Sequence, residues 1–80
     1  MNMIIQTEIR FTGCRDKQLE QLLTGMGYDC DGNSGVTKST SILLVPYEGY
    51  NQGGKYAKAV KYGINRIPIQ KFKDNMNQYL

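Results

Sequence analysis

Two short stretches of this sequence each place glycine beside a cation, just after a segment that is expected to form a strand. In the first stretch, Thr12 offers a hydroxyl group and Gly13 offers an unobstructed N–H. Arg15 offers a guanidinium group that can bind two phosphate oxygens at once. In the second, Lys55 stands where a helix is expected to begin, beside free backbone N–H groups and the positive end of the helix dipole. Both stretches are therefore candidate phosphate-binding sites.

The second stretch also fits the nucleotide-binding pattern G-x-x-x-x-G-K over residues 49–55. The next residue, however, is Tyr56, where a nucleotide hydrolase needs a Ser or Thr hydroxyl to hold magnesium. We therefore keep only the anion-binding property. The alternative is that Thr12 caps a turn and that Arg15 and Lys55 are solvated surface charges.

Residues that could support catalysis are scarce. The sequence has no His, and its seven Asp and Glu residues are scattered over expected strand edges, helix surfaces and loops. Neither Cys14 nor Cys30 has an activating base beside it, and the pair lacks metal-ligand spacing. We predict a non-catalytic protein that needs no metal or cofactor and whose two cysteines are reduced and buried.

Length and charge limit the protein to one modest domain. The chain has 80 residues, of which 40% are hydrophobic, and its longest apolar run is the four residues 42–45, so no membrane span is predicted. The formal charge of +3 permits binding to an anionic partner, although many proteins without a nucleic-acid role carry as much. Residues 1–6 show no hydrophobic periodicity and are interpreted as a leader or linker. Residues 7–80 are interpreted as a single domain.

Hydrophobic periodicity predicts the order βαββαβα. The expected strands cover residues 8–12, 28–31, 41–45 and 64–67. Three helices are expected. The first begins after Asp16, which caps it, the second covers residues 54–62, and the third has Pro68 in its first turn and runs to Leu80. Strands that alternate with helices favour an α/β fold with a parallel sheet. In such a sheet both anion-binding stretches leave the carboxyl ends of strands and open on the same edge.

Apolar faces are expected on each helix. The first helix carries Leu19, Leu22, Leu23 and Met26 at the spacing of one stripe, and the last carries Ile69, Phe72, Met76 and Leu80. In the second helix the small side chains of Ala57, Ala59 and Val60 are expected to pack closely on the sheet.

The order and spacing of these segments resemble a BRCT domain over about residues 7–80. The resemblance is carried by the sequences FTG at 11–13, GMG at 25–27, VTKSTSILLV at 36–45, GK at 54–55 with KA at 58–59, GI at 63–64, and Phe72. It is closest to the C-terminal BRCT domains of NAD-dependent DNA ligases of viral or phage type. The resemblance implies a three-layer sandwich in which a four-stranded parallel sheet of order 2-1-3-4 has the first and third helices on one face and the second on the other.

The same resemblance implies roles for particular residues. Family members that bind phosphate use residues that match Thr12, Gly13 and Lys55, and in one that binds 5′-phosphates on DNA an arginine that matches Arg15 assists. Many members have a Trp in the third helix, whereas this chain has no Trp and presents Phe72, which we interpret as a core residue. The chain contains only one copy of the domain. Family members that recognise phosphopeptides sequence-specifically have two copies in tandem, so this function is not expected here.

The leading hypothesis is an intracellular accessory module of a larger DNA-processing enzyme, acting in the cytoplasm of a bacterial host or at a nuclear or viral replication site. Its expected partner is DNA with a 5′-phosphate, or else a phosphoprotein. Lys38, Lys58 and Lys61 are either DNA-backbone contacts or solvated charges. One rival is a protein-interaction module, which binds a phosphorylated or unmodified partner or dimerises, with Tyr47 and Tyr50 on its surface. The alternative for these two tyrosines is packing within the loop. Another rival is a structural domain that positions the catalytic regions of a larger enzyme.

Overall fold

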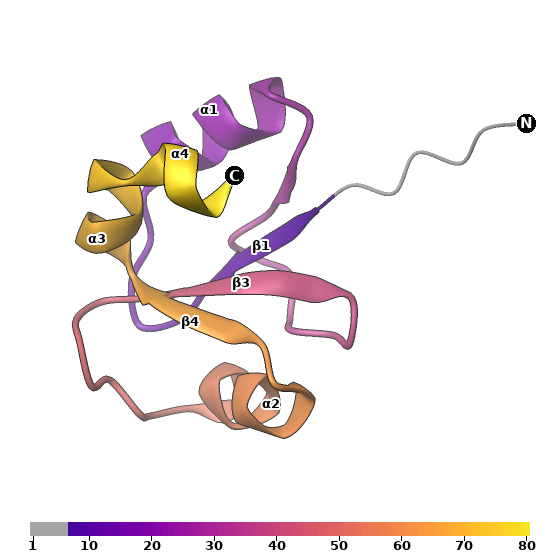
Figure 1. The fold of residues 1–80 in the computed structure, drawn as a ribbon. Helices are drawn as coiled ribbons and strands as arrows, with labels where there is room; N and C mark the ends of the chain where they lie inside the picture. Colours follow the sequence, from indigo (N-terminus) through magenta and orange to yellow (C-terminus); the bar gives the residue numbers. More distant parts are fainter. Residues whose placement is uncertain (1–6) are drawn as a thin grey trace, which may run out of the picture.

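A four-stranded parallel sheet forms the centre of the molecule in the computed structural model, which describes residues 7–80. The interpretation of residues 1–6 as a leader lies outside the described residues. The strands are β1 (Glu8–Phe11), β2 (Asp29–Cys30), β3 (Thr40–Val45) and β4 (Asn65–Pro68). They lie in the order β2-β1-β3-β4, which confirms the predicted α/β fold and strand order. The crossovers that parallel neighbours require are supplied mainly by the helices (Figure 1).

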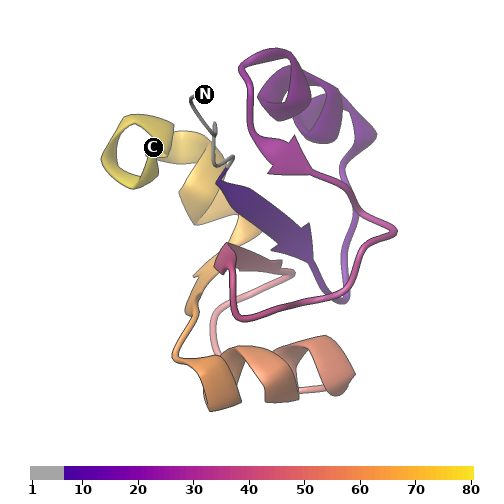
Figure 2. The same ribbon diagram turned by 90° about the vertical axis from the view of Figure 1, so that its right-hand side faces the viewer.

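Helices cover both faces of this sheet. They are α1 (Lys17–Gly25), α2 (Gly54–Tyr62), α3 (Ile69–Asp74) and α4 (Met76–Tyr79). The elements α1, α3 and α4 lie on one face and α2 lies on the other, as Figures 1 and 2 show. The predicted three layers are therefore present. No helix within residues 7–80 has the length and apolar character needed to cross a membrane.

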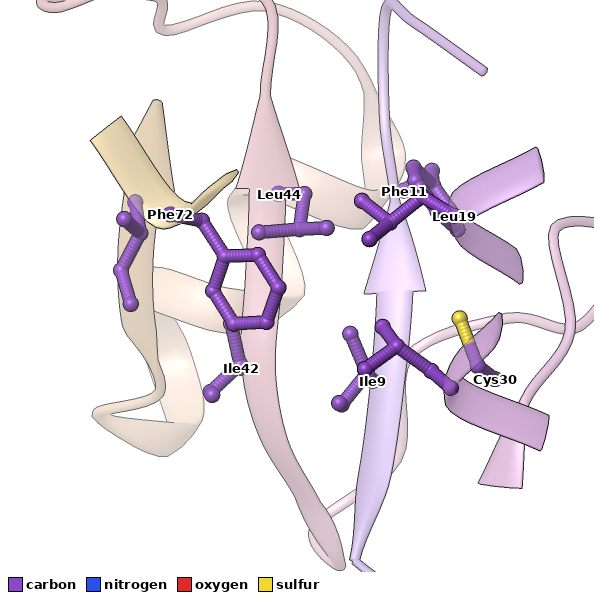
Figure 3. Close-up of a cluster of buried hydrophobic side chains, with 9 residues drawn as sticks. Ile9, Phe11, Leu19, Cys30, Ile42, Leu44 and Phe72 are labelled. Atoms are coloured by element: carbon purple, nitrogen blue, oxygen red, sulfur yellow. The ribbon is translucent and has the colours of Figure 1, made fainter. Parts of the chain in front are cut away.

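The larger core cluster lies between the sheet and the layer formed by α1 and α3 (Figure 3). Ile9 and Phe11 point into it from β1, and Phe72 reaches it from α3 with no exposed surface, which confirms the interpretation of Phe72 as core. The smaller cluster lies under α2 and consists of Val36, Leu43, Val45, Ala59 and Ile64. Successive side chains of a strand point to opposite faces, so β3 supplies both clusters.

The apolar stripe of α1 is narrower than predicted. Leu19 and Leu23 are buried, but Leu22 and Met26 are 52% and 53% exposed. The sheet covers only the line of the helix on which residues at spacing i, i+4 lie, and the flank at i+3 and i+7 faces away from it. Leu22 instead borders a shallow groove between α1 and the segment around Met76.

A carboxylate cap joins the start of α1 to α3. The Asp16 Oδ1 atom accepts a hydrogen bond from the Leu19 N–H at 3.0 Å, and Lys73 Nζ donates to Asp16 Oδ2 at 2.8 Å. These interactions lower the pKa of Asp16 below its ordinary value of 3.8, the Lys73 hydrogen bond most strongly. The prediction that Asp16 caps the first helix is therefore confirmed, and the same side chain also links α1 to α3.

We expect replacement of this cap to give a pH-dependent loss of stability. Because the pKa of Asp16 is lower in the folded state, its contribution is present above the unfolded value and is lost as pH falls through the folded value. Asp16→Ala should lower the free energy of unfolding by about 1 kcal/mol at pH 7. Urea unfolding at pH 7 and at about pH 2.5 checks this, since the difference from wild type should shrink at the lower pH. A difference that stays constant would contradict the ionic contribution, and Asp16→Asn serves as the control that keeps a cap without the charge.

The C-terminal helix, predicted as one element from Pro68 to Leu80, is in fact two, so the described residues hold four helices instead of three. The break falls at Asn75, whose Nδ2 donates to the Lys71 carbonyl at 3.0 Å and whose N–H donates to the Phe72 carbonyl. The side chain thus takes an acceptor that a continuous helix would use for its own backbone. Pro68 also differs from the prediction, since it ends β4 and caps α3 instead of lying in its first turn.

The contact of α2 with the sheet is smaller than predicted. Ala59 is fully buried, whereas Ala57 is exposed and Val60 is 50% exposed. The residues of α2 that are buried or half-buried lie on one side of the helix and are Lys55, Tyr56, Ala59 and Tyr62. The small side chains of Ala57 and Val60, which flank this side, therefore did not indicate that these residues are buried.

Candidate functional site

The two candidate anion-binding stretches meet at the carboxyl edge of the sheet. Lys55 Nζ donates a hydrogen bond to the carbonyl of Phe11, the last residue of β1, at 2.9 Å. The Thr12 Oγ1 atom lies 3.8 Å from the point where a Cβ atom would stand on Gly53, immediately before α2. Figure 2 shows the end of β1 and the first turn of α2 on the same side of the molecule. We call the group formed by Thr12, Gly13, Gly53 and Lys55 the junction.

The ammonium group of Lys55 is held in place from two sides. Besides the Phe11 carbonyl, it approaches the Gly32 carbonyl at 3.5 Å, in the loop that follows β2. An ammonium group has three donors, so two carbonyls leave one donor for a further acceptor. The Lys55 side chain is half-buried, and the Phe11 carbonyl that its ammonium group contacts directly precedes Thr12 in the chain.

The start of α2 adds backbone donors to the junction. Its first backbone bond runs from the Ala57 N–H to the Gly53 carbonyl, and no side chain caps the helix. The N–H groups of the first turn before Ala57 therefore have no acceptor within the helix, and they carry the positive end of its dipole. Gly53 has a φ of 90°, a conformation that favours glycine, and this sets the direction in which those groups point.

Tyr50 packs directly on Gly13. Gly13 has a φ of 68°, and a Cβ atom built on it would stand 2.7 Å from both the Cζ and the Oη of Tyr50. Tyr47 contacts the Tyr50 ring edge to face, with the ring centroids 5.6 Å apart. The sequence left two alternatives for these tyrosines, an interaction surface or packing within the loop. The structure packs Tyr50 on Gly13 and brings its hydroxyl into the junction, where a glycine is needed to admit it.

Arg15 borders the junction without entering it. Its guanidinium pairs with Glu20 at 3.3 Å and donates to Asn33 Oδ1 at 2.9 Å. The Glu20 carboxylate also accepts the Gly32 N–H at 2.9 Å, so Arg15, through Glu20, and Lys55 are both connected to the loop at Gly32. The Arg15 side chain is 40% exposed but that of Glu20 only 16%, so releasing Glu20 to bind a phosphate costs more than the about 0–1 kcal/mol of a fully exposed ion pair.

The three outer lysines occupy different positions. Lys58 and Lys61 are exposed on α2, so they extend a row of cations from Lys55 along about 9 Å of helix. Lys38 is also exposed, but it precedes β3 and therefore lies at the amino edge of the sheet, away from the junction. The structure thus groups Lys58 and Lys61 with the junction and separates Lys38 from it.

The two thiols are free, and their surroundings favour the protonated form. Cys30 is buried, and this burial raises its pKa to about 11. Cys14 lies in the loop after Gly13 but is only partly buried, which is less than predicted. Burial, followed by the charge of Asp16, raises the pKa of Cys14 as well. A thiol with a raised pKa is a poor nucleophile at neutral pH.

The fold and the junction define a parallel α/β domain whose carboxyl edge presents a cation, a hydroxyl group and a helix N-terminus together. Comparison with protein-family models, with curated proteins and with solved structures finds no match to this chain.

Proposed function

We propose that this chain is a non-catalytic, BRCT-like phosphate-binding module that engages DNA ends or nicks through their 5′-phosphate. It would act as an accessory domain of a DNA ligase or of another DNA replication or repair protein. The observation that carries the proposal is the contact of Lys55 Nζ with the last carbonyl of β1, 2.9 Å away, which brings the two stretches to one edge. A hydroxyl group, backbone amides and a cation can then share one anion.

The distribution of charge supports DNA as the source of the phosphate. Lys58 and Lys61 lie on the exposed side of α2, three and six residues beyond the half-buried Lys55, and the whole chain carries a formal charge of +3. A row of lysines contacts successive backbone phosphates without reading the sequence. Arg15 adds a second cation beside the loop that contains Gly32 and Asn33.

The proposal predicts a preference for a phosphorylated end. A 5′-phosphorylated duplex should bind about tenfold or more tightly than the same duplex with a 5′-hydroxyl, since hydrogen bonds to charged groups contribute about 1.5–3 kcal/mol. Fluorescence anisotropy over a range of salt concentrations measures both affinities. Two to three backbone contacts should give a log-log slope of about −2 to −3. Equal affinity for the two duplexes would contradict the proposal.

A protein-interaction module is the second candidate, and the surface of α1 favours it. Leu22 and Met26 are each about half exposed there, beside the groove that Met76 also lines. Such a surface suits an unmodified partner or a second copy of the chain. A phosphopeptide titrated in the same assay tests a phosphorylated partner, because tighter binding of the peptide than of the phosphorylated duplex would favour protein recognition. The sedimentation coefficient of the chain alone tests for a second copy.

A further inference from the structure

We infer that a cleft beside the junction binds the nucleobase of the nucleotide that carries the 5′-phosphate, so that the ligand is a terminal nucleotide with an unpaired base. This inference rests on the proposed function, and it names the part of the DNA that the proposed function leaves open. It is carried by the position of the cleft, the side chains that line it, and its size.

The cleft lies at the same carboxyl edge of the sheet as the junction. It has a volume of about 220 Å³ and is bounded by the ends of β3 and β4, at Val45 and Pro68, and by the first turn of α2 at Tyr56. The loop residues Glu48 and Tyr50 close another side. Junction and cleft therefore share the strand ends and the start of α2.

Tyr50 is the wall between the two sites. Tyr50 lines the cleft, and atoms of its ring and its hydroxyl lie within 2.9 Å of the point where a Cβ atom would stand on Gly13 in the junction. Tyr47 supports the ring edge to face, and the packing of Tyr50 against the smaller core cluster fixes its position further. A phosphate in the junction would thus have the cleft on the other side of one aromatic ring, where the base attached to its sugar could lie.

Arg66 and Tyr56 form a second flat wall. Ile67 turns into the larger core cluster, so its neighbour Arg66 turns to the α2 face of β4. There the Arg66 guanidinium carbon lies 5.5 Å from the centroid of the Tyr56 ring, a cation–π arrangement. Because β4 is an edge strand, this pair is open to solvent on its outer side.

These side chains match the chemistry of a base. Tyrosine rings and guanidinium planes stack on unpaired bases with little regard to sequence. The Glu48 carboxylate can accept an exocyclic amino group at the rim of the cleft. The volume of about 220 Å³ is below the roughly 300–1,000 Å³ of pockets for larger ligands, so it suits one base. A base enters most easily where it is already unpaired, which favours 5′ overhangs and flaps over blunt ends.

The test uses four ligands that share one duplex with a 5′ overhang. The first nucleotide is either normal or abasic, and it carries either a 5′-phosphate or a 5′-hydroxyl. For the phosphorylated pair, we expect the abasic ligand to bind about tenfold more weakly, because stacking of one base on an aromatic ring typically contributes a factor of this order.

Two variants locate this effect in the cleft. Tyr56→Leu and Arg66→Ala should each remove most of the preference for the normal nucleotide while the preference for phosphate over hydroxyl remains. Tyr56→Phe, which keeps the ring, should behave as wild type. Lys71→Ala is the matched control for Arg66→Ala, because it removes one exposed cation from α3 on the opposite face of the sheet.

The outcomes separate the two proposals. Equal binding of normal and abasic ligands, with the phosphate preference intact, would overturn the nucleobase site and leave the proposed function standing. Loss of the phosphate preference in wild type would overturn the proposed function and this inference with it. If Tyr56→Leu unfolds in a circular-dichroism melt, the exposed Arg66 still decides the question through Arg66→Ala.

Discussion

Lys55→Ala should weaken binding to a 5′-phosphorylated duplex about 10- to 100-fold and leave binding to the 5′-hydroxyl duplex within about twofold. The reason is that the Lys55 ammonium group contacts the carbonyl directly before Thr12 and that Lys55 lies in the first turn of α2, where the phosphate is proposed to lie. Fluorescence anisotropy at one fixed salt concentration measures both ligands. The ratio of the two affinities reports on the junction alone, because contacts along the DNA backbone are common to both.

The position of Lys55 explains why a large effect is expected from one lysine. A lysine side chain carries up to about 2 kcal/mol of rotamer entropy, which a surface lysine must lose when it binds. Here the carbonyls of Phe11 and Gly32 already hold the ammonium group. Binding then requires little further ordering, so more of the charge-assisted hydrogen bond appears as affinity.

Lys58→Ala is the matched control, one helical turn further along α2. Lys58 is exposed, so its loss should weaken both duplexes to the same extent and reduce the salt slope by about 1 if it contacts a backbone phosphate. If Lys55→Ala does not change the ratio of the affinities for the two duplexes, Lys55 has a purely structural role. In that case Lys55→Ala would lower the melting temperature, since it leaves the Phe11 carbonyl without this donor, while the ratio of affinities stayed at the wild-type value.

Periodicity and glycine positions were enough to predict the sheet and most of the helices. The stretch 54–62 has an apolar residue at the inner position and glycine at both ends, and α2 has those bounds. Local pattern failed where a side chain competes with the backbone, as at Asn75, whose amide bonds the Lys71 carbonyl. It also failed where burial depends on how much of a helix the sheet covers, as at Val60 and Leu22.

The candidate site was predictable to the extent that its residues lie at strand-to-helix boundaries. Thr12, Gly13 and Lys55 stand at such boundaries, and the parallel sheet brings them to one edge. Tyr50 and Arg66 could not be found in this way, because one lies within a loop and the other within a strand. Their roles arise only from contacts between distant segments, such as the 5.5 Å approach of Arg66 to Tyr56.

Arg10 is the strongest case of a residue that the sequence pattern did not explain. It occupies a polar position in the alternation of β1, yet it is only 4% exposed. Its Nη1 donates to the Asp29 carbonyl at 2.7 Å and its Nε to the Gly35 carbonyl at 3.2 Å. Its Nη2 lies 3.2 Å from carboxylate oxygens of both Glu8 and Asp29. The guanidinium thus joins β1 to β2 and to the loop that follows β2.

Arg10→Ala should therefore lower the free energy of unfolding by about 3 kcal/mol, because removing one member of a buried ion pair leaves the others without compensation. We expect the lower end of the usual range, since the Asp29 side chain is 41% exposed and water can solvate it after the change. Total stabilities of domains are about 5–15 kcal/mol, so this is a large fraction. Urea unfolding at pH 7 measures the loss. Arg66→Ala, which removes an exposed arginine of β4 and its cation–π contact with Tyr56, should cost only about 0.5–1 kcal/mol.

The same substitution links stability to the site. The loop that Arg10 holds through Gly35 also contains Gly32, whose carbonyl accepts from Lys55 at 3.5 Å. Loosening this loop removes one of the two acceptors that position the ammonium group, so folded Arg10→Ala should also bind the phosphorylated duplex more weakly. A loss of stability below about 1 kcal/mol would show that water replaces the guanidinium well, and the carbonyls and carboxylates around Arg10 would then not depend on it.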